Sequence, residues 1–186
     1  AWNTLKQYIA TTSDNSASRF DSGFGYANAA SLISDLDQVE LSEKSRIFTG
    51  FSEFDRVLGG GFIEGSVVLL GGDPGAGKST LLLQALARIK ETKKVLYVTG
   101  EESLEQLAIR ARRLGLPVEG LSVATETRAQ AIANHISKNS PSVVIIDSIQ
   151  VMQIESLDST PGSLSQVRET AAYFTRLAKT RGVVIV

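Results

Sequence analysis

The chain has 186 residues, 42% of them hydrophobic, which is enough for one compact α/β domain with an appended segment. Its 19 basic and 20 acidic residues leave a net charge of -1 and exclude a general electrostatic attraction of the whole chain to nucleic acid, so any such site must be local. No cysteine is present, which excludes disulfides and thiolate metal sites, and no apolar run approaches the roughly 20 residues that cross a bilayer, so we expect no membrane contact.

Residues 1–45 differ in composition from the rest of the chain. The stretch 10–31 is rich in Ser, Asn, Ala and Gly and has no sustained hydrophobic period, which indicates a flexible linker or tail. The acidic stretch 34–46 is compatible with one turn of helix or with a solvated spacer.

Alternating helix and strand patterns occupy residues 46–186. Apolar residues at Phe51, Phe54, Val57 and Leu58 predict a helix that ends at the glycines 59–61. Strands are predicted at 66–72, 94–100, 121–125, 141–148 and 183–186, and helices at 77–91, 103–116, 128–139 and 163–182. This alternation predicts a mostly parallel, doubly wound sheet. The continuous apolar run at 66–72 further predicts a strand that is buried on both faces.

The segment "GGDPGAGKST" carries the P-loop pattern Gly72-x-x-x-x-Gly77-Lys78-Ser79. Glycines let the backbone N–H groups of the loop turn toward phosphate oxygens, Lys78 adds a charge for the β- and γ-phosphates, and the Ser79 hydroxyl is a ligand for Mg²⁺. The alternative is a chance glycine turn, but the apolar run before the motif and the helix after it favour a nucleotide site. The predicted ATP-binding residues are Gly72, Asp73, Pro74, Gly75, Ala76, Gly77, Lys78, Ser79 and Thr80.

Asp147 ends the apolar run 143–146, where a strand tip would meet the phosphates. We predict that it holds Mg²⁺ together with Ser79, directly or through water. The alternative is an acid that merely begins a turn.

Glu101 and Glu102 directly follow the strand 94–100. If that strand lies beside the Asp147 strand, Glu101 emerges next to Asp147 and can hold a water in line with the γ-phosphate. The alternative is a helix start, because Ser103 and Gln106 fit a capping box and an acid there contributes about 0.3–1 kcal/mol. We therefore take Lys78, Glu101 and Glu102 as catalytic candidates and prefer Glu101, which is nearer the strand tip.

Several stretches together resemble the bacterial RadA/Sms family of DNA-repair ATPases. They are "TGFSEFDRVLGGG", "GGDPGAGKSTLLLQ", "YVTGEES", "RARRLGL", "VVIIDSIQ" and "PGSLSQVRETAAYFTRLAKTRGV". The resemblance covers residues 46–186 and implies a RecA-type ATPase core, with strand 183–186 between the Asp147 strand and the P-loop strand. It also implies that Glu101 positions the attacking water.

The resemblance further implies a ring-forming ATP-driven motor, hexameric at full length, that binds single-stranded and branched DNA. Such a motor promotes branch migration alongside a RecA-type recombinase at the nucleoid of the bacterial cytoplasm. Residues 1–4 resemble the end of that family's zinc finger, whose cysteines this chain lacks, so no zinc site is expected here. The chain ends on an apolar strand, and we therefore expect a core truncated on its C-terminal side with weak ATPase activity of its own.

The loop 152–165 faces the central channel in RecA-type proteins. It contains Glu155 and Asp158 and no basic residue, so by itself it is a weak argument for DNA binding. The candidate DNA contacts are Ser163, Arg168, Arg176 and Lys179, for which a solvated helix face is an equal alternative. A surface or intersubunit role is the favoured interpretation of Arg110, Arg112 and Arg113.

Two functional classes stay open for this chain. The first is a DNA-stimulated ATP hydrolase, and the alternative is a module of the RecA/KaiC type whose ATP state controls assembly with little turnover. A small-molecule kinase is disfavoured because no arginine-bearing lid is found.

Overall fold

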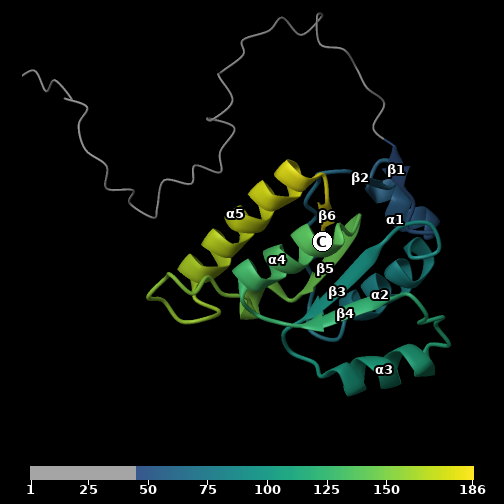
Figure 1. The fold of residues 1–186 in the computed structure, drawn as a ribbon. Helices are drawn as coiled ribbons and strands as arrows, with labels where there is room; N and C mark the ends of the chain where they lie inside the picture. The colour runs from purple at the N-terminus through teal and green to yellow at the C-terminus, as the bar shows by residue number, and fades with distance from the viewer. Residues whose placement is uncertain (1–44) are drawn as a thin grey trace, which may run out of the picture. The chain divides into compact units, whose positions relative to one another are not determined.

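The computed structural model describes residues 45–186 (Figure 1). The predicted linker at 1–45 therefore lies, except for Ser45, outside the described residues. Within 45–186, no helix is both long enough and apolar enough to cross a membrane.

Four parallel strands form the main sheet, in the order β4-β3-β5-β6. They are β3 (Val95–Thr99), β4 (Ser122–Thr125), β5 (Val143–Asp147) and β6 (Val184–Ile185). A separate antiparallel pair joins β1 (Arg46–Ile47) to β2 (Phe62–Ile63). The register sets Thr99 opposite Thr125 on one side and Asp147 on the other, so the carboxyl ends of three strands meet at one edge.

Helices cover both faces of this sheet (Figure 1). They are α1 (Ser52–Val57), α2 (Lys78–Ile89), α3 (Leu104–Arg113), α4 (Ala129–Asn139) and α5 (Leu164–Arg181), with a short 3-10 helix, η3, at Ile149–Val151. The predicted doubly wound arrangement is confirmed, and each helix lies within a few residues of its predicted range.

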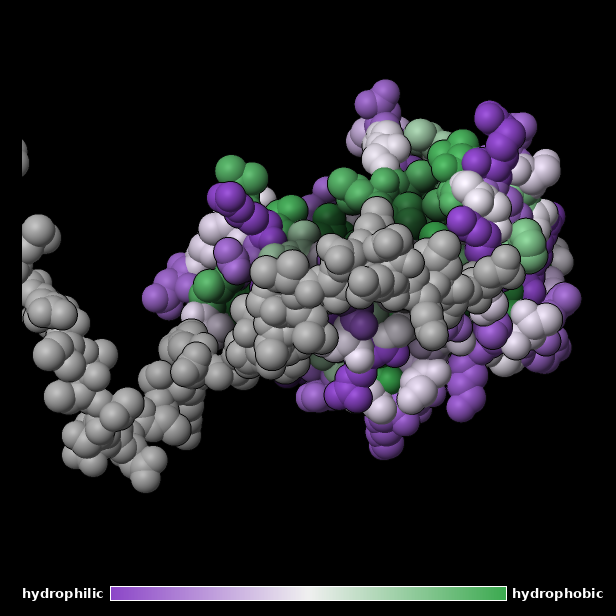
Figure 2. Space-filling model, turned by 90° about the horizontal axis from the view of Figure 1, so that it is seen from above, coloured by the Kyte–Doolittle hydropathy of each residue, from purple (hydrophilic) through white to green (hydrophobic). Residues whose placement is uncertain are grey.

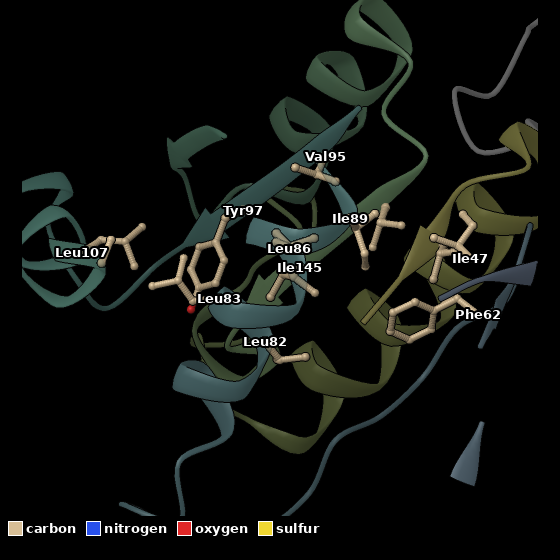
Figure 3. Packing of buried hydrophobic residues seen from close by; sticks show 13 residues of the cluster. Ile47, Phe62, Leu82, Leu83, Leu86, Ile89, Val95, Tyr97, Leu107 and Ile145 are labelled. Carbon is tan, nitrogen blue, oxygen red and sulfur yellow. The ribbon is translucent and has the colours of Figure 1, made fainter. Parts of the chain in front are cut away.

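Two apolar cores result from the alternation of side chains along the strands. On one face, Tyr97 and Ile145 pack with Leu83 and Leu86 of α2 and Leu107 of α3 (Figure 3). On the other face, the intervening strand residues Val98, Val144 and Ile146 pack with Ile132 of α4 and Phe174 of α5. Because β3 and β5 are covered on both sides, nearly all of their residues are buried.

The segment 66–72 differs from its prediction as a strand buried on both faces. Its contact with the sheet is one isolated parallel bridge between Val67 and Ile185, where the Val68 N–H donates to the Ile185 carbonyl at 2.9 Å. Val68 and Leu70 pack on the core, whereas Leu69 is 84% exposed. Leu69 is exposed because the segment 66–72 lies at the border of the sheet, beyond β6. No part of residues 45–186 covers Leu69 there. Apolar groups also reach the surface on the face seen in Figure 2.

The expected position of the last strand is confirmed. β6 lies between β5 and the segment that leads into the P-loop. This order brings the P-loop to the same edge of the sheet at which β3 and β5 end.

Candidate nucleotide site

The P-loop is an exposed turn that leads into α2, with residues 71–77 all open to solvent. Gly75 and Gly77 have φ of 80° and 87°. An added Cβ would meet no atom within 4 Å at either position, so glycine is needed there for its backbone conformation and not for space. Gly77 is the N-cap of α2, and its left-handed conformation starts the helix directly behind the loop.

Lys78 reaches back over this loop. Its Nζ donates to the carbonyl of Gly72 at 2.6 Å and to that of Asp73 at 2.8 Å, and both bonds are exposed. Lys78, Ser79 and Thr80 are the first residues of α2, where backbone N–H groups have no acceptor within the helix. The loop thus combines a cation with free N–H groups of a helix N-terminus, which suits an anionic ligand.

Asp147 and Ser79 approach each other across Tyr97. The Tyr97 hydroxyl donates to Oδ2 of Asp147, and the Ser79 side chain interacts with the same phenol. Burial and the neighbouring Asp147 carboxylate raise the pKa of Tyr97 above its ordinary value, so the phenol keeps its proton at neutral pH. The two proposed magnesium ligands, one at the tip of β5 and one at the start of α2, are therefore brought together.

Glu101 lies beside Asp147, because β3 pairs with β5 as the hypothesis required. Its carboxylate accepts a hydrogen bond from Ser148 Oγ at 2.7 Å and one from Gln150 Nε2 at 3.3 Å. The sequence interpretation missed Ser148 and Gln150, although both follow Asp147 closely within "VVIIDSIQ".

Gly100 allows the chain to turn between β3 and Glu101. An added Cβ at this position would come within 2.5 Å of Val151 Cγ2 and 3.1 Å of Thr127 Cγ2. Its N–H donates to the Asp147 carbonyl at 3.1 Å and so continues the pairing of β3 with β5 by one residue. The tight fit brings Glu101 close to the tip of β5.

Glu102 has a different environment from Glu101. Its carboxylate forms an ion pair with Arg110 of α3, and its side chain is 30% exposed while that of Arg110 is 17% exposed. The predicted capping box at Ser103 and Gln106 is confirmed, with bonds of 3.2 and 3.0 Å. Arg110 therefore does not lie on a solvated face, since α3 turns this arginine inward toward Glu102, while the intersubunit role stays a prediction.

We predict that Arg110→Met lowers the free energy of unfolding by about 1–3 kcal/mol, because Glu102 then keeps a half-buried charge without its partner. Urea denaturation measures the change, and Arg113→Met on the exposed side of the same helix is the matched control. The double variant Arg110→Met with Glu102→Gln should recover part of the loss. An equal loss of unfolding free energy in Arg113→Met would show that the ion pair between Arg110 and Glu102 does not stabilise the fold.

Glu126 is a further carboxylate near this edge, just after β4. It accepts bonds from Arg128 Nε at 3.0 Å and Nη2 at 2.8 Å. Chiefly through these bonds, its pKa is lowered to about 2. A carboxylate so firmly paired is a poor proton acceptor, which leaves Glu101 as the better candidate base.

The four candidate DNA contacts lie along one helix. Ser163 is the N-cap of α5 and accepts a bond from the Gln166 N–H at 3.4 Å. Arg168 and Lys179 are exposed and Arg176 is half-buried. Eleven residues of helix separate Arg168 from Lys179, or about 17 Å of axis, so these groups form an extended row and not a compact cluster.

Gln166 organises the loop that precedes this helix. It is 1% exposed; its Oε1 accepts from the Ile154 N–H at 2.9 Å, and its Nε2 donates to the carbonyls of Ile154 and Ser159 at 3.2 and 2.9 Å. Sequence reasoning missed this role, because a glutamine on a helix carries no local signal of burial.

Comparison with known proteins gives a consistent result. The sequence profile of the family described as "ATPase: KaiC" matches residues 47–182. Over its whole length, the chain is 52% identical to the DNA repair protein RadA of Salmonella typhimurium strain LT2 and 50% identical to that of Escherichia coli K12, covering 41% of each relative. The RadA protein of Bacillus subtilis strain 168 is 43% identical over the whole chain and 40% of its own length.

The chain thus spans about two fifths of the length of the curated relatives it matches. The family match and the parallel sheet together confirm the expected α/β fold of RecA type, and the resemblance to RadA proteins is confirmed.

Proposed function

Because the chain belongs to the KaiC-type ATPase family, we propose that it hydrolyses ATP with Mg²⁺ and couples this reaction to work on DNA during repair. The observation that carries the proposal is the meeting of the P-loop, Asp147 and Glu101 at one edge of the sheet. The relatives named DNA repair protein RadA support the DNA part.

In this proposal, residues 72–80 bind the phosphates of ATP through loop N–H groups and Lys78. Ser79 and Asp147 hold Mg²⁺; a hydroxyl and a carboxylate are hard oxygen ligands, and Mg²⁺ usually takes one or two protein ligands besides phosphate oxygens and water. Within residues 45–186, no three His, Cys, Asp or Glu side chains gather into a metal site, so phosphate and water must complete the coordination. When bound, the ion neutralises charge that develops on the phosphates.

Glu101 then acts as the base that positions water. The water oxygen attacks the γ-phosphorus, the bond from this phosphorus to the β–γ bridging oxygen breaks, and ADP and phosphate are the products. Glu101 accepts the proton that the water loses, while Ser148 and Gln150 orient its carboxylate. Glu102, paired with Arg110, contributes through the fold of α3 and not through contact with the water.

The DNA substrate is proposed to be single-stranded or branched, with branch migration beside a RecA-type recombinase as the outcome and a hexameric ring as the working assembly. Ser163, Arg168, Arg176 and Lys179 are the proposed contacts with the DNA backbone. The acidic Glu155 and Asp158 are exposed on the preceding loop, so the attraction for phosphate must come from the cations of α5. The relatives are bacterial proteins, which makes nucleoid DNA in the cytoplasm the proposed target.

We expect single-stranded DNA to raise the ATP turnover of the natural protein, and the stimulation to weaken as salt is added, because phosphate contacts release counterions. The double change Arg168→Gln with Lys179→Gln should lower the slope of log affinity against log salt by about 0.7 for each lost contact. The matched control is Lys93→Gln with Lys94→Gln, two exposed lysines before β3.

The alternative of an ATP-controlled assembly module predicts a different result. ATP turnover would be the same with and without DNA, and light scattering would show nucleotide-dependent assembly. If the slope of log affinity against log salt were equal in both double variants, α5 would not be part of the DNA interface.

A further inference from the structure

Tyr97 is a fully buried aromatic residue at the centre of β3, with 0% of its surface exposed. Its ring packs in the cluster formed with Leu83 of α2 and Leu107 of α3 (Figure 3). A phenylalanine would fill the same apolar space equally well. The hydroxyl is therefore the part of this side chain that packing alone does not explain.

Burying a hydroxyl without a partner is costly, and this one has a hydrogen-bond partner on another element. It donates to Oδ2 of Asp147 at the tip of β5, and the Ser79 side chain at the start of α2 interacts with the same phenol. The positive charge of Arg110 on α3 also acts on it. One phenol thus interacts with both side chains that the proposed function assigns to Mg²⁺.

We propose that Tyr97 is a positioning residue that sets the orientation and separation of the magnesium ligands Ser79 and Asp147. With Oδ2 bound to Tyr97, Asp147 keeps Oδ1 for the ion or its water. Ser79, which interacts with the same phenol, keeps its hydroxyl oxygen for the ion. Tyr97 does not touch the ion itself, and it acts as the outer hydrogen-bond partner that metal ligands require. This inference rests on the proposed function.

The test compares Tyr97→Phe with the unmodified full chain in ADP binding by calorimetry, over a range of free Mg²⁺ and in excess EDTA. We expect ADP affinity in EDTA to stay within about twofold, because the P-loop is untouched, and the strengthening by Mg²⁺ to fall about 10- to 100-fold. Mn²⁺ in place of Mg²⁺ gives a second readout, since its electron paramagnetic resonance spectrum reports the symmetry of the site.

Tyr173→Phe is the matched control, because this half-buried tyrosine of α5 packs in the core on the other face of the sheet. Circular dichroism checks that each variant folds. Tyr97→p-aminophenylalanine, which keeps a donor at the same ring position, should restore the Mg²⁺ dependence.

An unchanged Mg²⁺ dependence in folded Tyr97→Phe overturns this inference alone. Failure of the unmodified chain to bind ADP more tightly with Mg²⁺ overturns the proposed function and this inference with it.

Discussion

Glu101→Gln is expected to lower ATP turnover by about 10²-fold or more in the natural protein, while ATP binding is retained. The amide keeps the size of the side chain and can still contact Ser148, but it cannot accept the proton of the attacking water. Steady-state turnover measures the loss, and calorimetry with a non-hydrolysable ATP analogue measures the binding that should persist.

Two variants next to this position separate catalysis from structure. Glu102→Gln should lower ATP turnover much less than Glu101→Gln does. It should lower the free energy of unfolding more, because the carboxylate of Glu102 is paired with Arg110. Glu105→Gln, at an exposed acid in the first turn of α3, should leave turnover unchanged and cost only the about 0.3–1 kcal/mol of its interaction with the helix dipole. If Glu102→Gln lost more turnover than Glu101→Gln, the assignment of the catalytic glutamate would be reversed.

Lys78→Ala is expected to weaken ATP and ADP binding by roughly 10- to 150-fold, which corresponds to the about 1.5–3 kcal/mol of hydrogen bonds to charged groups. The fold should be retained, because the carbonyls of Gly72 and Asp73 that Lys78 contacts are exposed and water can replace the ammonium group. Calorimetry measures the affinity, and circular dichroism measures the fold.

Lys93→Ala removes an equal charge from an exposed site between α2 and β3 and serves as the control for net charge. If a folded Lys78→Ala variant bound nucleotide with unchanged affinity, Lys78 would not be part of the nucleotide site. A similar loss in both variants would point to a general effect of charge.

The local parts of this protein were predictable from sequence. The P-loop is contiguous because a single turn must direct several adjacent N–H groups at one ligand, so its residues are recognised by spacing alone. The helices and the strands β3, β4 and β5 follow from hydrophobic period, a property of neighbouring residues. The doubly wound sheet follows in turn from their alternation.

The partners of the site residues were decided by the tertiary structure. Ser148 meets Glu101 across 47 positions of the chain, and the Tyr97 hydroxyl meets Asp147 across 50. No local pattern encodes these contacts, because they depend on the register that sets Thr99 opposite Asp147.

The same holds for the two glutamates and for the segment 66–72. Glu101 and Glu102 are adjacent in sequence and similar in chemistry, and they differ because α3 directs Arg110 at Glu102 alone. The apolar run 66–72 has the composition of a central strand, but its exposure depends on what packs beside it, and Leu69 has no such neighbour within residues 45–186. Composition determines which residues can be buried, whereas burial and pairing depend on elements that are distant in the chain.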